Sequence, residues 1–189
     1  MNGKQAVIIG GGGVALRKLR TLLAAGAAVR LVATHICPEI ATMADSGTVA
    51  VRIGSYDARD LDNAFIAVAA TDDPLVNGQV AADARERGIL VVVADNPAAG
   101  DCIFPAILQR GDLEIAVTTG GRCPAFSVYV RDCIAENISS EYGTILDRLA
   151  AERDKLLTNG SSGTYNTQVL RSLAARLLAE LTELKGPLP

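Results

Sequence analysis

Aromatic residues, histidines and paired cysteines are scarce in this sequence of 189 residues. Tryptophan is absent and aromatic residues make up only 4% of the chain, so Ala, Val, Leu and Ile must fill the interior, as is typical of a parallel sheet covered by helices. The four cysteines lie far apart, with no Cys-x-x-Cys pair, at Cys37, Cys102, Cys123 and Cys133. Because His35 is the only histidine, the ligand spacing of a zinc or iron–sulfur site is missing. We therefore expect buried free thiols in a reducing compartment and no metal site.

Strong positive charge and long apolar runs are also missing. The net charge of −3 lacks the basic excess of nucleic-acid-binding proteins. No apolar run reaches the ~20 residues that a membrane helix needs, and the run near the N-terminus is too short for a secretion signal. These absences predict a cytoplasmic protein that has neither a nucleic-acid nor a membrane partner.

A glycine-rich turn is the most informative feature that is present. Residues 6–9 indicate a short buried strand, and residues 14–23 have helical spacing. Between them, Gly10, Gly12 and Ala15 match the Gly-x-Gly-x-x-Gly/Ala pattern of dinucleotide-binding folds. The first allows a tight turn, the second lets a pyrophosphate approach the backbone, and the small third lets the helix pack on the strand. The alternative is a glycine turn of an unrelated α/β protein, and the βαβ unit that follows argues against it.

Strands and helices alternate over the first hundred residues, which predicts an α/β fold with a Rossmann-type, doubly wound parallel sheet. The predicted strands are residues 6–9, 28–33, 49–53, 65–70 and 89–94. The predicted helices are residues 14–23, 38–45 and a third that contains 76–84. Right-handed crossovers bring the carboxyl ends of the strands to one edge, where ligands bind. That edge carries Gly10, Gly12, Gly13, Val14, Thr34, His35, Thr71, Asp72 and Asp95.

The pattern changes near residue 100. Two strands are predicted at residues 102–108 and 113–118, followed by a turn at 118–124. Three helices are predicted after it: one with Phe126, Val130 and Ile134, one at 140–157 and one at 165–185. A linker separates the last two helices at residues 159–163. The last helix carries a stripe of Leu170, Leu173, Leu177, Leu181 and Leu184, which is core or the surface that meets a partner subunit. Apolar faces after residue 113 need partners, which predicts a symmetric homodimer.

The residue inventory excludes some dehydrogenase classes. None of the four tyrosines is followed by lysine four residues later, as short-chain dehydrogenases require. The only histidine, His35, follows the second strand and is misplaced for the acid/base of hydroxy-acid dehydrogenases. That strand ends in Thr34 and His35 where an acidic residue usually binds the ribose, so the position does not distinguish NAD from NADP.

Carboxylates are the proton acceptors that remain at the ligand edge: Asp72, Asp73 and Asp95. Asp95 ends an apolar strand, where partial burial would make it a better base. The alternative is that Asp95 caps the next turn, through Asn96 and Pro97. The residues alone leave these two interpretations open.

Five motifs occur in an order that resembles one family. They are Gly10–Lys18 (Gly-Gly-Gly-x-Val-Ala-x-Arg-Lys), Ala69–Asn77 (Ala-Ala-Thr-Asp-Asp-x-x-Val-Asn), Asp95, Ile103–Arg110, and Thr118–Pro124 (Thr-Thr-Gly-Gly-x-x-Pro). Over roughly residues 3–140 the chain is similar to the precorrin-2 dehydrogenase module of sirohaem synthase. One departure is Val92, where relatives often have Asn.

This resemblance implies an NAD-dependent oxidation of precorrin-2 to sirohydrochlorin. It implies that Asp95 is catalytic and that Gly13, Val14, Thr34 and His35 line the cofactor. It also implies a nucleotide-binding domain over residues 1–112, a dimerisation region over 113–140 and a C-terminal helical domain over 141–189.

A polycarboxylated tetrapyrrole needs cations and N–H donors around its cleft. The substrate-binding candidates are Thr119, Gly120, Gly121 and Arg122, with Arg110 and Arg131 as further cations. Thr119 stands where some relatives carry a phosphorylated serine.

Three functions remain open: the dehydrogenase, a chelatase that inserts ferrous iron into sirohydrochlorin at the same site, and a nucleotide-sensing module without turnover. The sensing module would leave the Thr118–Pro124 motif unexplained.

Overall fold

The computed structural model describes residues 1–158 and 163–185, so the predicted linker at 159–163 lies outside the described residues except for Gly163. The chain divides into two compact units, Met1–Phe104 and Pro105–Pro189, and each is described by itself. The first unit contains β1 (Gln5–Ile9), α1 (Gly13–Ala24), β2 (Ala28–Ala33), α2 (Pro38–Asp45), β3 (Ala50–Ile53), η1 (Ala58–Leu61), β4 (Ile66–Ala69), α3 (Pro74–Glu86), β5 (Leu90–Val93) and η2 (Pro97–Ala99). The second contains β6 (Ala106–Arg110), β7 (Leu113–Val117), α4 (Pro124–Asn137), α5 (Glu141–Thr158) and α6 (Gly163–Lys185). The three-part division at residues 112 and 140 stays a prediction.

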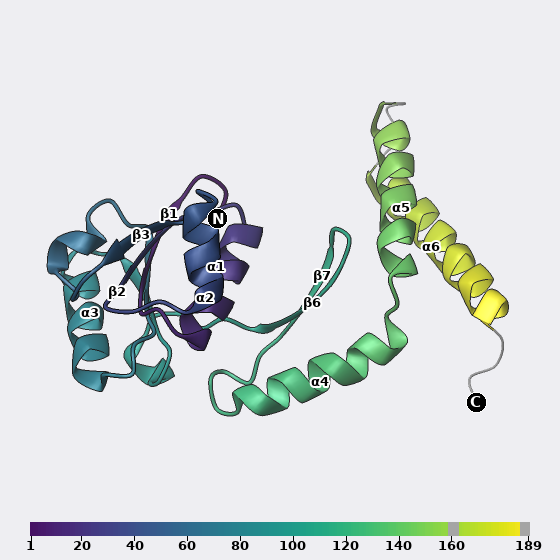
Figure 1. Ribbon diagram of the computed structural model, residues 1–189. Helices are drawn as coiled ribbons and strands as arrows, with labels where there is room; N and C mark the ends of the chain where they lie inside the picture. The colour runs from purple at the N-terminus through teal and green to yellow at the C-terminus, as the bar shows by residue number, and fades with distance from the viewer. Residues whose placement is uncertain (159–162, 186–189) are drawn as a thin grey trace. The chain divides into compact units, whose positions relative to one another are not determined.

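The first unit is a parallel sheet of five strands flanked by helices, of which α1, α2 and α3 are labelled in Figure 1. The strand order is β3-β2-β1-β4-β5. This confirms the predicted doubly wound sheet. The strand order reverses at β1, because β2 follows on one side and β4 on the other. In such sheets the crevice outside the carboxyl ends at this reversal is the usual nucleotide site.

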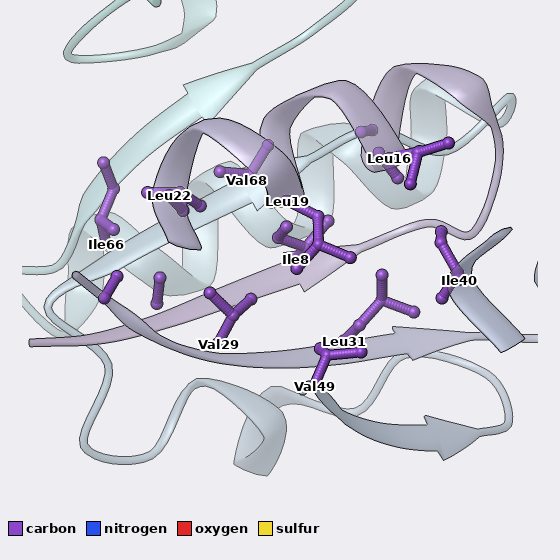
Figure 2. Packing of buried hydrophobic residues seen from close by; sticks show 14 of the residues in the cluster. Ile8, Leu16, Leu19, Leu22, Val29, Leu31, Ile40, Val49, Ile66 and Val68 are labelled. Atoms are coloured by element: carbon purple, nitrogen blue, oxygen red, sulfur yellow. The ribbon is translucent and has the colours of Figure 1, made fainter. Parts of the chain in front are cut away.

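Apolar side chains cover both faces of the sheet, so the core has two halves. Alternate residues of β1 point to opposite faces: Ile8 lies in one hydrophobic cluster and Ile9 in the other. Helices α1 and α2 cover the first face, where Leu19 and Ile40 are fully buried against the strands (Figure 2). Burying one such side chain contributes roughly 1.5–3 kcal/mol. Helix α3 and the short helix η1 cover the second face.

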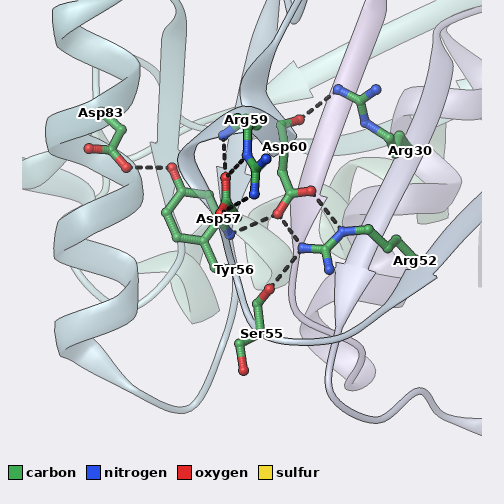
Figure 3. Close-up of polar contacts among 8 residues, drawn as sticks. All are labelled: Arg30, Arg52, Ser55, Tyr56, Asp57, Arg59, Asp60 and Asp83. Atoms are coloured by element: carbon green, nitrogen blue, oxygen red, sulfur yellow. Dashed lines mark hydrogen bonds and ion pairs between the residues drawn. The ribbon is translucent and has the colours of Figure 1, made fainter.

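The connection from β3 to β4 uses a polar network in place of a long crossover helix. Arg52 Nε donates to Asp60 Oδ1 at 2.8 Å, and Asp60 also accepts from the Asp57 backbone N–H (Figure 3). Tyr56 Oη donates to Asp83 Oδ2 on α3 at 2.7 Å, and burial together with this contact raises the pKa of the phenol. These bonds fasten the connection to β3 on one side and to α3 on the other.

Strand β6 starts four residues later than the predicted strand at 102–108. Before it, Phe104 packs against the first core cluster, and the Lys18 ammonium lies 4.4 Å from the centre of its ring. Burial and the neighbouring Arg17 lower the pKa of Lys18. Pro105 has no N–H to donate to a ladder, so pairing begins at Ala106.

The second unit combines a hairpin with three helices. Strands β6 and β7 pair antiparallel around Gly111, whose φ of 60° requires glycine. Helix α4 packs on both strands, and α5 packs along α6 (Figure 1). In the leucine stripe of α6, Leu177 is buried and Leu170, Leu173 and Leu181 are partly buried, whereas the Leu184 side chain lies outside the described part. Within residues 1–158 and 163–185, no helix is both long and apolar enough to span a bilayer.

Candidate nucleotide and catalytic site

Two glycines of the β1–α1 turn are required by close backbone packing. Gly10 has a φ of 128°, and a Cβ built on it would lie 2.3 Å from the Ala70 carbonyl oxygen. A Cβ on Gly11 would lie 1.9 Å from the His35 carbonyl oxygen. No side chain fits at either distance. These glycines therefore allow the end of β1 to pass between the chain that leaves β2 and the chain that leaves β4.

The next two glycines face open space. A Cβ on Gly12 or Gly13 would meet nothing within 4 Å, and Gly12 has an ordinary φ of −90°. Gly12 is the N-cap of α1 and offers no side-chain hydrogen bond to the first helical turn. The first N–H groups of a helix have no partner within the helix and carry its positive dipole end. This cradle has the room and the donors that fit a dinucleotide pyrophosphate.

The chain after β2 lies beside this cradle. The Cys37 backbone N–H donates to the Gly11 carbonyl at 2.9 Å, which fastens the β2–α2 loop to the glycine turn. Thr34 and His35 are exposed, and His35 Nδ1 lies 3.3 Å from Thr34 Oγ1. The structure thus brings these two predicted cofactor residues to the edge that carries Gly12, Gly13 and the partly exposed Val14.

The ends of β4 and β5 hold the candidate base. Asp95 Oδ1 accepts a hydrogen bond of 3.0 Å from the side-chain amide of Asn77 on α3. The same amide bonds Thr71, which follows β4. Among the described residues Asp95 Oδ2 has no hydrogen-bond partner, so one oxygen of the carboxylate is held and the other is available to a ligand.

Two expectations about these carboxylates need correction. The Asp95 side chain is exposed, so the partial burial expected from its place after an apolar strand is not found, although Ala94 before it still packs against the first core cluster. Asp95 also does not cap the following turn, because its carboxylate bonds Asn77 and no backbone N–H of η2. The capping role belongs to Asp73, which accepts from the Leu75 N–H at the start of α3. Asp72 is exposed beside it.

The predicted substrate residues lie together in the second unit, in the turn before α4. Thr119 Oγ1 accepts from the Cys123 N–H at 3.1 Å and from Ser127 Oγ at 3.2 Å. Gly120 and Gly121 have φ values of 64° and 79°, which glycine adopts without strain. The Thr119 hydroxyl therefore holds the N-terminal turn of α4. The backbone N–H groups of Gly120 and Gly121 are not shielded by side chains of their own.

Only one of the three candidate arginines is uncommitted. Arg110 Nε donates to the Ile138 carbonyl at 2.7 Å and so caps the C-terminal end of α4. Arg131 pairs with Asp132 at 2.5 Å. Arg122 is exposed and has no ion pair within the described chain, so it is the arginine available to an anion.

Asn77 is the site residue to which we gave no role from the sequence. It occurs in the Ala69–Asn77 motif, but its side chain is 1% exposed and bonds Thr71 and Asp95 at once. A weak signal was its residue type, since asparagine is a poor helix former, although its neighbour Gly78 in α3 is a poorer one still. In the part of the chain that the structure describes, no cluster of three or more His, Cys, Asp or Glu side chains is arranged to hold a metal ion.

Comparison with known proteins extends these observations. Residues 1–106 match a family described as "putative NAD(P)-binding". Siroheme synthase of Pseudomonas entomophila (strain L48) is 41% identical over 156 residues, which is 82% of this chain and 34% of that protein. Siroheme synthase of Chromobacterium violaceum is 44% identical over 142 residues, 75% of this chain and 30% of that protein. The chain therefore spans about a third of the length of these curated relatives.

A solved structure covers nearly the whole chain. The structure described as "SirC, precorrin-2 dehydrogenase" aligns with 95% of this chain and 94% of its own, with a TM-score of 0.75 and 25% sequence identity. Similarity of this extent includes both compact units.

Proposed function

We propose that this chain, which belongs to the "putative NAD(P)-binding" family and is related to the siroheme synthases, oxidises precorrin-2 to sirohydrochlorin with NAD as the hydride acceptor. The resemblance drawn from the five motifs is confirmed at the level of the family. The observation that carries the proposal is a carboxylate with one free oxygen, Asp95, on the same sheet edge as a glycine cradle suited to a dinucleotide. A nicotinamide cofactor follows from the family, and the choice of NAD over NADP is part of the proposal.

The reaction removes two hydrogens from the reduced macrocycle, one as a hydride and one as a proton. Bound in the cradle, the nicotinamide would supply the hydride acceptor. The residues of this chain do the rest: the Gly12 and Gly13 backbone holds the phosphates, and Asp95 Oδ2 accepts the proton. The carbon loses its hydride and the macrocycle its proton, so the product gains one double bond and the charges balance.

The carboxylates of precorrin-2 require a second group of contacts. Arg122 is exposed and uncommitted, and Gly120 and Gly121 offer backbone N–H groups without side chains. We assign substrate binding to these residues, together with Thr119, which holds the turn in place. The four cysteines are free thiols, which suits the cytoplasm that we propose as the location. The expected burial of these thiols is not found, since Cys123 is exposed and the other three are only partly buried.

We also propose that the protein acts as a homodimer through its second unit. Helix α4 exposes Phe126 at 55%, Val128 at 43% and Tyr129 at 64%, and the rings of Phe126 and Tyr129 stack on each other. Contiguous exposed apolar side chains of this kind mark protein interaction sites. Sedimentation at micromolar concentration checks this: a fully active monomer contradicts the proposal.

A chelatase activity at the same site is the second candidate. It is favoured by the free Oδ2 of Asp95, because the pyrrole protons that iron insertion releases need an acceptor of this kind. A nucleotide-sensing module that binds the cofactor without turnover is the third candidate, and it leaves Arg122 and the glycine turn before α4 without a role.

The deciding experiment incubates the purified protein with precorrin-2 and NAD and follows the absorbance of sirohydrochlorin. Asp95→Asn is the matched variant, because it keeps the shape of the side chain but accepts no proton. We expect its rate to fall about 10²–10⁴-fold with little change in NADH affinity. Binding of NADH without any oxidation by the wild type would instead support the sensing module.

A further inference from the structure

The side chain of Asn77 is buried at the point where three elements meet. It is 1% exposed and lies at the end of the first turn of α3, between the chain that follows β4 and the chain that follows β5. Its Oδ1 accepts from the Thr71 N–H at 3.1 Å and from Thr71 Oγ1 at 2.8 Å. Its Nδ2 donates to the Thr71 carbonyl at 3.1 Å and to Asp95 Oδ1 at 3.0 Å. All hydrogen-bonding capacity that a buried amide needs is thus satisfied.

The orientation of this amide is fixed by its neighbours. A backbone N–H can only donate, so the Asn77 atom that faces the Thr71 nitrogen must be the oxygen. The Thr71 carbonyl can only accept, so the atom facing it must be the NH₂ group. The second N–H of that group consequently points at Asp95. A flipped amide would turn its NH₂ group toward the Thr71 N–H, donor against donor. It would also turn its oxygen toward the Thr71 carbonyl and Asp95 Oδ1, acceptor against acceptor.

The segments that carry Asn77 and Asp95 contain no cation that could pair with Asp95 in place of this hydrogen bond. Residues 70–79 and 94–99, the two segments that the Asn77–Asp95 bond joins, contain no lysine, arginine or histidine. The other ionisable groups in these segments are the carboxylates Asp72 and Asp73, and the β1–α1 turn at 10–13 is glycine alone. In the described structure, Asn77 is therefore the donor that Asp95 has.

We infer that Asn77 is a positioning residue that clamps Asp95 Oδ1, so that Oδ2 is held free to accept the proton of the macrocycle. This inference rests on the proposed function. Thr71 anchors the clamp, because three of the four Asn77 bonds go to it. The clamp explains how an exposed carboxylate after a strand keeps one direction without a cation beside it.

Asn77→Asp is the sharpest test, because it keeps the oxygen that accepts from Thr71 and replaces the N–H directed at Asp95 by a second carboxylate. Removing a donor and adding a like charge favour the protonated form of the base. We expect the acidic limb of kcat/KM to move up by about one pH unit or more, with unchanged affinity for NADH. Asp83→Asn is the matched control: Asp83 is also buried on α3 but bonds Tyr56 and Gln79, so its loss should lower the melting temperature without moving the pH profile.

A measurement on the wild type keeps the test valid if Asn77→Asp does not fold. In the ¹⁵N-labelled protein, the Asn77 side-chain NH₂ signals should shift with pH as Asp95 titrates, and this shift should vanish in Asp95→Asn. An Asn77 signal that ignores Asp95, or a folded Asn77→Asp with the wild-type pH profile, overturns the clamp. A wild type that does not oxidise precorrin-2 overturns the proposed function, and the NH₂ titration still judges the clamp independently.

Discussion

Gly12→Val separates a glycine that a ligand needs from a glycine that the fold needs. Gly12 has extended backbone angles, φ −90° and ψ −172°, which valine adopts without strain. A Cβ added there meets nothing within 4 Å in the protein itself. We therefore expect Gly12→Val to fold with a melting temperature close to that of the wild type.

Cofactor binding should respond very differently. The added methyl groups occupy the space in front of the first N–H groups of α1, where the phosphates would bind. A hydrogen bond to a charged group contributes roughly 1.5–3 kcal/mol. Loss of two such bonds corresponds to roughly 3–6 kcal/mol, or about 10²–10⁴-fold weaker binding at 1.4 kcal/mol for each factor of ten. A fluorescence titration with NADH measures this directly.

Gly11→Ala is the opposing control. Its Cβ would lie 1.9 Å from the His35 carbonyl oxygen, so the loop after β2 must move before the variant can fold. We expect a large loss of melting temperature from this single methyl group. The reasoning fails if Gly12→Val binds NADH as tightly as the wild type, or if Gly11→Ala melts at the wild-type temperature.

Three further predictions concern stability and thiol chemistry. Gly78→Ala should raise the free energy of unfolding by about 0.5–1 kcal/mol, because Gly78 lies in α3 with nothing within 4 Å of an added Cβ; a decrease in a urea titration would contradict this. Tyr56→Phe removes the donor to Asp83 Oδ2 and should lower the free energy of unfolding by about 1–3 kcal/mol. An unchanged midpoint of urea unfolding would show that water replaces this hydrogen bond. Iodoacetamide should modify exposed Cys123 before Cys102, because burial raises the pKa of the Cys102 thiol; mass spectrometry of early time points reveals the order, and the reverse order would refute the placement.

Most of the first unit could be predicted from the sequence because its signals are local. Strand β2 (Ala28–Ala33) and helix α2 (Pro38–Asp45) have the predicted bounds. An apolar run that ends at polar residues defines the first, and a proline at the first helical position defines the start of the second. The parallel order follows from the alternation of such segments and from the handedness of their crossovers.

The start of β6 and the β3–β4 connection depended on contacts between distant residues. The apolar run that begins at Cys102 resembles a strand, but Phe104 packs against the first core cluster beside Lys18 of α1, and Pro105 has no N–H to donate, so pairing begins at Ala106. The network of Arg52, Tyr56 and Asp60 likewise joins side chains whose partners no local pattern indicates.

The site shows the same division between local and distant information. The spacing of the glycines indicated the turn, yet only the close approach of Ala70 to Gly10 and of His35 to Gly11 distinguishes the packing glycines from those that face a ligand. The open space at Gly12 depends on where the rest of the folded chain lies, and the local sequence does not reveal this.

The role of Asp95 depended on the direction of its side chain. A carboxylate after a strand can turn back to cap the next helix or point outward as a base, and both choices use the same backbone position. Asn77, eighteen residues earlier in the chain, decides between them by bonding one oxygen and leaving the other free. Because that amide is itself oriented by the Thr71 backbone, the choice is set by the packing of α3 against β4 and β5. The sheet therefore supplies the position of the base, and the helix supplies its direction.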